Sequence, residues 1–191
     1  YVSDVEQVAG RFETPPVIIG HSMGGFLTQK YLEKHDAPAA VLLASIPYYG
    51  LWPTFFRMLV QRPSSVLKAI AQLRLYPIVE SLDAARWSMF SMDMPKELVV
   101  KYQAKMNDES FRMFIDLLGL NLANPKKVKT PLLILGAEFD NAIAPDQVHA
   151  TARAYKVKAE IFANMAHDMM LEANWRSVAE KILSWLKEKG I

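Results

Sequence analysis

The sequence predicts an α/β protein with a parallel sheet of about four strands, flanking helices and an inserted helical section. Short apolar runs alternate with helical patterns near both ends of the chain. One of these runs, Val17–Ile19, leads into the turn Gly20–Gly25, which carries a serine and precedes a helical pattern. Between residues 47 and 124 the strand-like runs stop, and helical stretches punctuated by prolines take their place.

Composition narrows the classes of function. The 191 residues are 51% hydrophobic, enough to bury a core, and the formal net charge is only +2. These charges are spread along the chain, which argues against nucleic-acid binding. The chain has no cysteine, which excludes disulfides and is compatible with the cytoplasm without fixing a compartment. No apolar run approaches the length of a membrane span, and the first residue, Tyr1, leads us to expect a longer or processed protein.

The first part of the chain has the pattern of a β–α–β unit. A short N-terminal helix precedes it, where Ser3 and Glu6 have the spacing of a capping box. The strand Val17–Ile19 and the serine turn are followed by a helix to about His35. The next run, Ala39–Ser45, is almost wholly apolar and of strand length, which is typical of a buried parallel strand.

The α/β pattern returns in the last third of the chain. We expect four elements there: a strand over Leu132–Leu135, a helix from Pro145 to about Tyr155, a weaker strand over Ala159–Ala163 and a helix over about Asn174–Glu188. We therefore divide the chain into a core part at residues 1–46, a helical insertion at 47–124 and a second core part at 125–191.

The helical insertion is rich in large apolar side chains and is expected to cap the site. Such side chains would line a pocket for an acyl or alkyl group. The candidate substrate-binding residues are His21, Trp52, Phe55, Trp87 and Phe90. The alternative is that the apolar groups of the insertion only pack its helices together, as most of them must do in any case.

The serine turn has the G-x-S-x-G pattern of a nucleophile elbow. Ser22 would occupy a strained turn that exposes its hydroxyl, and crowding two residues before and after it would favour Gly20 and Gly24. The helix that follows would direct its first N–H groups and its positive dipole end at the serine oxygen. The alternative is a glycine-rich turn with an incidental serine.

A serine nucleophile needs a base, and the base needs an acid that orients it. Sites in open α/β sheets lie at the carboxyl ends of the strands. Asp140 follows the third predicted strand and His167 follows the fourth. The order Ser22, Asp140, His167 is the one expected for this architecture, so we assign the nucleophile, acid and base in that order.

Other residues compete for these roles. Glu138 precedes Asp140 by two residues and is an alternative acid. His21 adjoins the serine and is expected to be a wall of the pocket rather than the base. His35 stands at a helix end, where histidine commonly caps the dipole, and His149 falls within a helix and is expected at the surface.

Three stretches carry a resemblance to a known family: Pro16–Gly25, Pro131–Ala137 with Asp140 and Pro145, and Ala166–Asp168 with Glu172. On these residues the chain resembles the α/β-hydrolase superfamily, in the branch of capped serine esterases and lipases. The resemblance implies a partial α/β-hydrolase fold, a catalytic triad of Ser22, Asp140 and His167, and the backbone N–H of Met23 as an oxyanion donor. It implies neither a metal nor an organic cofactor.

The chain departs from the family pattern in two places. Ala166 stands where the family often has glycine before the histidine, which requires only ordinary backbone angles there. The N-terminal strands of the family, with the loop that supplies a second oxyanion N–H, have no counterpart in this sequence. We therefore expect the strand Val17–Ile19 to lie at the sheet edge, where it would associate with another chain or with a missing N-terminal segment.

The sequence thus favours a serine hydrolase that cleaves carboxylic esters with an apolar acyl or alcohol part. Related activities on the same triad are those of thioesterases, lactonases, haloperoxidase-like enzymes and hydroxynitrile lyases. Dehalogenase and epoxide hydrolase chemistry is disfavoured, because it needs an aspartate where this chain has Ser22. The alternative is a catalytically incomplete fragment or binding module. The expected partner is a small-molecule ester, with no nucleic acid and no membrane span.

Overall fold

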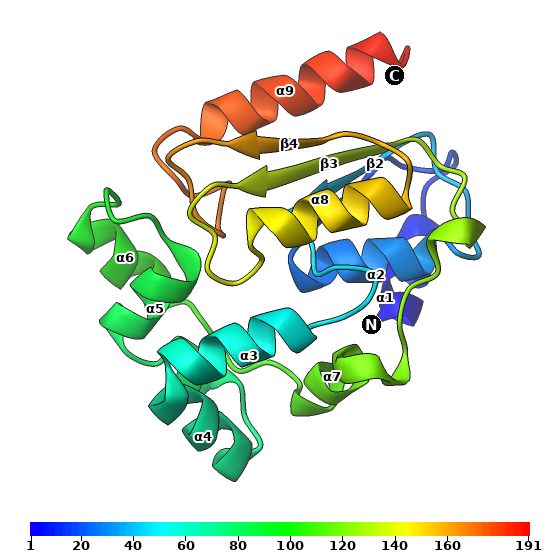
Figure 1. Ribbon diagram of the computed structural model, residues 1–191. Helices are drawn as coiled ribbons and strands as arrows, with labels where there is room; N and C mark the ends of the chain where they lie inside the picture. Colours follow the sequence, from blue (N-terminus) through cyan, green and yellow to red (C-terminus); the bar gives the residue numbers. More distant parts are fainter.

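The computed structural model describes residues 1–191 and contains a four-stranded sheet with helices on both faces (Figure 1). The strands follow the chain order across the sheet: β1 (Ile18–His21), β2 (Ala40–Leu43), β3 (Leu132–Ala137) and β4 (Ala159–Phe162). Each neighbouring pair is parallel. The predicted α/β class with a parallel sheet of about four strands is confirmed.

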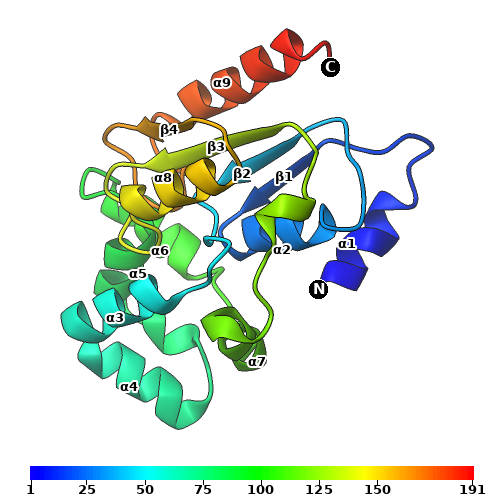
Figure 2. The ribbon, with the colours of Figure 1, turned by 45° about the vertical axis from the view of Figure 1, so that its right-hand side comes forward.

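Strand β1 lies at an edge of the sheet, as the sequence predicts. It pairs with β2 alone, and β2 is hydrogen-bonded to β3 on its other side (Figure 2). Ile19, in the middle of β1, is 54% exposed, whereas every residue of β2 is buried. The backbone groups along the outer side of β1 therefore have no partner strand within the chain.

Two layers of core flank the sheet because successive side chains of a strand point to opposite faces. On one face, Leu42 and Ile134 pack with helices α2 (Met23–Tyr31) and α8 (Pro145–Ala154). On the other face, Leu43 and Leu135 pack with α9 (Trp175–Glu188). Figure 1 shows α9 on one side of the strands and α2 and α8 on the other. A sheet covered on both faces explains why β2 and β3 are continuous apolar runs.

The helical insertion forms a group of short helices that lies outside the sheet (Figure 2). Its elements are α3 (Trp52–Gln61), α4 (Pro63–Gln72), the 3₁₀ turn η1 (Tyr76–Ile78), α5 (Leu82–Met89), α6 (Lys96–Gln103), α7 (Phe111–Ile115) and the wider turn η2 (Asp116–Leu120). A 3₁₀ turn, η3 (Pro125–Lys127), leads back to β3. The helical character that the sequence predicts for residues 47–124 is thus present in the structure.

Helix α1 (Val2–Ala9) differs from its prediction at the start. It begins after Tyr1 without any side-chain cap. The carboxylate of Glu6 accepts a hydrogen bond from His35 Nε2 at 3.0 Å instead of reaching back to the chain near Ser3. A tertiary partner therefore displaces the predicted capping box.

The strands β1 and β3 are longer at their carboxyl ends than the sequence predicts. Gly20 and His21 continue the ladder of β1 because they pair with Leu42 and Leu43 of β2. The elbow serine therefore follows the strand directly. None of the helices has both the length and the apolar character needed to cross a membrane.

Candidate active site

Ser22 occupies a tight turn between β1 and α2. Its backbone angles are φ 52° and ψ −117°, a conformation that costs a non-glycine residue about 1–3 kcal/mol. Main-chain hydrogen bonds hold the turn: Ser22 N–H donates to Leu43 O at 3.0 Å, and Ile46 N–H donates to Ser22 O at 3.0 Å. Neighbouring β2 thus fixes the strained residue that presents the hydroxyl.

The glycines around Ser22 have different roles. A Cβ on Gly20 would lie 2.4 Å from Gly24 O, and a Cβ on Gly25 would lie 2.4 Å from the hydroxyl of Ser45. A Cβ on Gly24 would meet nothing within 4 Å, and Gly24 lines the adjacent pocket. The predicted crowding is therefore right two residues before the serine and wrong two residues after it. On that side the close approach of the chain is at Gly25, where α2 crosses the segment after β2.

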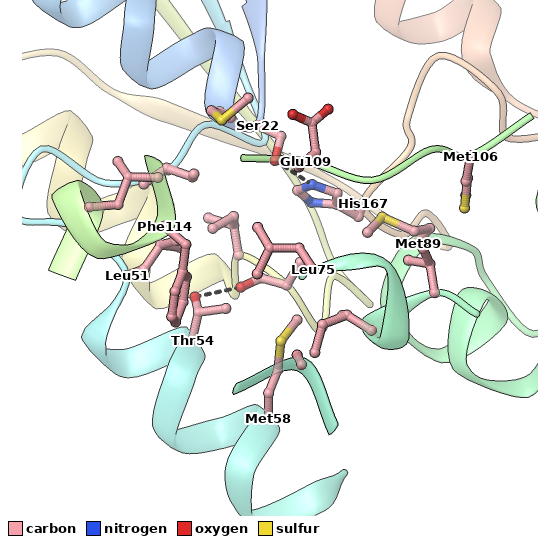
Figure 3. A pocket seen from close by; sticks show the side chains of 18 of the residues that line it. Ser22, Leu51, Thr54, Met58, Leu75, Met89, Met106, Glu109, Phe114 and His167 are labelled. Carbon is pink, nitrogen blue, oxygen red and sulfur yellow. Dashed lines mark hydrogen bonds between the residues drawn. The ribbon is translucent and has the colours of Figure 1, made fainter. Parts of the chain in front are cut away.

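The structure brings Ser22, His167 and Asp140 into one line of hydrogen bonds. His167 Nε2 lies 2.8 Å from Ser22 Oγ, and His167 Nδ1 lies 2.8 Å from Asp140 Oδ2. Asp140 follows β3 and His167 follows β4, so both come from carboxyl ends of strands. The side chains of Asp140 and His167 are almost completely buried. Figure 3 shows Ser22 and His167 at one end of a pocket.

Asp140 is fixed through both of its oxygens. Oδ1 accepts hydrogen bonds from the N–H groups of Ala142 at 2.8 Å and Ile143 at 2.7 Å, and Oδ2 faces His167. A carboxylate accepts at both oxygens, so Nδ1 of His167 carries the proton of their hydrogen bond. In the neutral ring Nε2 is then the acceptor, and the hydroxyl of Ser22 donates to it.

The protonation of His167 is set by opposing effects. Burial disfavours the charged ring, but the negative charge of Asp140, its hydrogen bond to Nδ1 and the charge of Asp168 outweigh burial. Together they raise the pKa of His167 above its usual value of 6.5. A base with a raised pKa accepts a proton more readily.

His21 lines the pocket beside His167. Its Nε2–H donates to the backbone oxygen of His167 at 2.9 Å, and the two rings lie 4.7 Å apart. Burial and the neighbouring charge of His167 lower the pKa of His21 to about 3, so its ring is neutral near pH 7. The structure therefore places His21 against the backbone of His167, and no hydrogen bond joins its ring to Ser22.

The other competing residues lie elsewhere. Glu138 is exposed and accepts a hydrogen bond from Asn164 N–H at 3.0 Å. His35 pairs with Glu6, and His149 is an exposed residue of α8. None of these three side chains is hydrogen-bonded to Ser22 or His167.

The pocket that opens at Ser22 has a volume of about 660 Å³, and 18 of its 27 lining residues are hydrophobic. Figure 3 shows Phe114, Thr54 and Met58 extending the wall away from His167. Most of the wall comes from the helical insertion, and the polar groups of Lys105, Asn107 and Glu109 line it as well. A mostly apolar cavity of this size suits a small molecule with an extended apolar part.

Of the five candidate substrate-binding residues, only His21 and Phe55 line this pocket. The structure places Trp52, Trp87 and Phe90 outside it. Trp52 is 45% exposed at the start of α3, and Trp87 carries the guanidinium of Arg62 at 5.2 Å from its ring. Phe90 is 3% exposed and packs with Met94 and Val99 inside the insertion.

Those three side chains point elsewhere because the packing of the insertion decides which helix face meets the site. The sequence signals apolar character but not direction. Pocket residues that were not singled out include Leu51, Met58, Leu75, Met89 and Phe114. Met58, Met89 and Phe114 are among the large apolar side chains of the insertion. The sequence held one usable signal for the pocket wall: Met58 lies three residues after Phe55, and residues three apart on a helix share a face.

Met23 and a cluster of titratable groups complete the site. Met23 is the first residue of α2, where backbone N–H groups have no partner within the helix, and it lines the pocket beside Ser22. Ligand atoms of His21, His167 and Asp168 lie within 4.8 Å of one another. His21 Nε2 and His167 Nε2 are engaged in hydrogen bonds with His167 O and Ser22 Oγ.

Comparison with known proteins adds independent information. The model of the alpha/beta hydrolase family matches residues 1–181. No curated protein sequence matches the chain significantly. Solved structures do resemble it at low sequence identity.

An esterase from Exiguobacterium antarcticum is 19% identical with a TM-score of 0.65, covering 97% of this chain and 72% of its own. A monoacylglycerol lipase from Paleococcus ferrophilus is 18% identical with a TM-score of 0.68, covering 98% and 74%. An N-acyl homoserine lactone degrading enzyme is 14% identical with a TM-score of 0.66, covering 96% and 72%. At these identities the likeness shows a shared fold.

Proposed function

Since this chain belongs to the alpha/beta hydrolase family, we propose that it is a serine hydrolase that cleaves carboxylic esters. Ser22 is the nucleophile, His167 the general base and acid, and Asp140 the residue that orients His167. The observation that carries the proposal is the chain of two 2.8 Å hydrogen bonds that joins these side chains at the mouth of an apolar pocket.

The first half of the reaction forms an acyl-enzyme. His167 Nε2 takes the proton of the Ser22 hydroxyl while Oγ bonds to the carbonyl carbon of the ester. Asp140 stabilises the imidazolium through the 2.8 Å contact with Nδ1. His167 then gives the proton to the leaving alcohol oxygen as the bond from carbon to that oxygen breaks.

The second half releases the acid. His167 takes a proton from a water molecule, whose oxygen bonds to the acyl carbon. The bond from that carbon to Ser22 Oγ then breaks, and the proton on Nε2 returns to Oγ. Each half passes through a tetrahedral intermediate with a negative oxygen, for which the N–H of Met23 at the start of α2 is the donor that we assign.

The pocket supports an ester with an apolar acyl or alcohol part. Its apolar wall extends from Ser22 along α3 and α4, including Phe55 and Met58. In this proposal the helical insertion, residues 47–124, acts as the cap that excludes water from the apolar group. The esterase and lipase names of the structural neighbours agree with this class of substrate.

Labelling with a fluorophosphonate and turnover of p-nitrophenyl esters test the proposal together. We expect the probe to label the wild-type chain at Ser22, and p-nitrophenyl butyrate to be hydrolysed. The Ser22→Ala variant should lose both, while Ser184→Ala, which removes an exposed hydroxyl of α9, should keep both. Undiminished hydrolysis by the Ser22→Ala protein would refute the assignment.

A binding module without turnover is the second candidate, and the edge position of β1 favours it. Only one oxyanion donor is assigned in this chain, and removing one such donor typically costs about 100- to 1,000-fold in rate. A folded chain that binds fatty acyl compounds but neither reacts with the probe nor hydrolyses esters would support this candidate.

Thioester and lactone substrates in the same assay separate the related activities of the triad.

A further inference from the structure

Arg57 of helix α3 reaches from the helical insertion to the loop that carries Asp140. Its Nε donates to the backbone oxygen of Asn141 at 2.9 Å, and its Nη2 donates to the backbone oxygen of Ala142 at 2.8 Å. Nη2 also lies 2.7 Å from Oε1 of Gln147. The guanidinium is partly buried, and the partners of its N–H groups are neutral oxygens.

The two peptide groups that Arg57 binds are the same two that hold Asp140. One joins Asn141 to Ala142, and its N–H donates to Asp140 Oδ1 at 2.8 Å. The other joins Ala142 to Ile143, and its N–H donates to the same oxygen at 2.7 Å. Each peptide therefore has the cation on its C=O side and the carboxylate on its N–H side.

This arrangement links two charges through two dipoles. A peptide group is planar, with its C=O and N–H pointing in opposite directions. A cation at the oxygen and an anion at the N–H both favour that orientation, and hydrogen bonds in such a chain polarise one another. Arg57 thus compensates the buried charge of Asp140 without touching it.

We propose that Arg57 is a positioning residue for the triad acid, holding Asp140 through the two peptide groups between Asn141 and Ile143. This inference rests on the proposed function, in which Asp140 orients His167. It gives the helical insertion a second role, since the same helix that walls the pocket also fixes the acid loop.

The contacts around Arg57 show which hydrogen bonds should remain when Arg57 is replaced. The hydroxyl of Thr54 also donates to the backbone oxygen of Ala142, at 2.6 Å, so that oxygen keeps a partner. Gln147 keeps its contact with the N–H of Ala144 at 3.1 Å. We therefore expect the Arg57→Met chain to fold, with a looser and less polarised acid loop.

Few charged groups act on Arg57 and on His167. Around Arg57, burial lowers the pKa of the guanidinium, and the charges of Asp140 and Asp146 and of Tyr49 oppose that lowering. Around His167 the acting charges are those of Asp140 and Asp168, and His21 faces it as a neutral ring. Removing the positive charge of Arg57 should therefore leave the negative field at His167 less compensated and raise its pKa.

The test compares Arg57→Met and Arg57→Lys with wild type on p-nitrophenyl acetate, a substrate too small to depend on the pocket. Active sites are counted with a fluorophosphonate, so that misfolded protein does not enter kcat. We expect kcat for Arg57→Met to fall about 10-fold with little change in KM, and the acidic limb of the pH profile to move to higher pH. Arg57→Lys should recover part of the loss, because it keeps the charge but lacks the two-nitrogen fork.

Arg62→Met is the matched control, because Arg62 also belongs to the insertion but pairs with Asp83 and donates no hydrogen bond to the acid loop. It should behave as wild type. A kcat for Arg57→Met within about two-fold of wild type with an unmoved acidic limb would overturn the proposal. If Arg57→Met fails to fold, the Arg57→Lys chain is judged by the same two measurements.

A titration of His167 followed by nuclear magnetic resonance separates this proposal from the proposed function. Lack of probe labelling and of ester turnover in wild type would count against the hydrolase assignment alone. In that case a higher pKa of His167 in Arg57→Met than in wild type supports the link through the two peptides. An equal pKa in the two chains overturns it.

Discussion

Replacing Asp140 with asparagine tests which ring nitrogen of His167 carries the proton. In the wild type, Oδ1 accepts from two backbone N–H groups and Oδ2 accepts from His167 Nδ1–H. The asparagine has one oxygen and one NH₂ group. Turning the NH₂ toward the N–H groups of Ala142 and Ile143 would bring donors against donors, so the oxygen stays there and the NH₂ faces His167.

The ring of His167 then has to change its tautomer. Nδ1 must accept from the new NH₂ group, so the proton moves to Nε2, which lies 2.8 Å from Ser22 Oγ. A protonated Nε2 cannot take the proton of Ser22. The same change in a serine protease lowers kcat about 10⁴-fold, and each factor of ten is about 1.4 kcal/mol, so we expect the barrier to rise by about 5–6 kcal/mol.

The assay is hydrolysis of p-nitrophenyl butyrate under saturating conditions, with the melting temperature measured in parallel. We expect Asp140→Asn to fold and to lose about four orders of magnitude in kcat. Glu138→Gln, which changes the alternative acid two residues away, should stay within about two-fold of wild type. Activity of Asp140→Asn within ten-fold of wild type, or an equal loss in Glu138→Gln, would refute the reasoning.

Four further outcomes are expected. The pKa of His167 is raised, and the base must be neutral to act, so kcat/KM should fall as the pH drops through a midpoint above 6.5. A midpoint below that value would contradict the effect that we assign to Asp140 and Asp168. Met58→Trp should shorten the longest p-nitrophenyl ester that is hydrolysed efficiently, with short esters as the internal control. Gly25→Ala should lower the free energy of unfolding by about 1–3 kcal/mol because its Cβ has no room, whereas Gly24→Ala should unfold like wild type in a urea titration. Ile19→Lys should reduce self-association of the chain in sedimentation velocity, since a charge blunts an exposed edge strand; a wild type that stays monomeric at all concentrations would remove the basis for this expectation.

Much of the fold was predictable because its signals are local. The strand-length runs that became β2 and β3 are apolar on both faces, and the structure covers both faces with helices. The turn around Ser22 was predictable because only a few residue types tolerate such a close crossing of strand and helix. The edge position of β1 followed from the resemblance to the family, because the family's N-terminal strands have no counterpart in this sequence.

Predictions failed where a distant partner decides the outcome. Ser3 and Glu6 have the spacing of a capping box, but His35, four residues beyond the end of α2, binds Glu6. Gly24 looked crowded from its place in the motif, yet the space beside it belongs to the pocket. Trp87 and Phe90 have the character of pocket residues, and only the packing of the insertion turns them away.

By itself, the sequence determined the class of fold and which side chains have the chemistry of a nucleophile, an acid and a base. Strand ends of a parallel sheet meet at one edge, so the order of Ser22, Asp140 and His167 was enough to expect them together. Only the tertiary structure decided which faces of the insertion line the pocket and that Arg57 reaches the acid loop. The physical reason is that periodicity along one helix carries no information about its rotation against another, which is set when the helices pack.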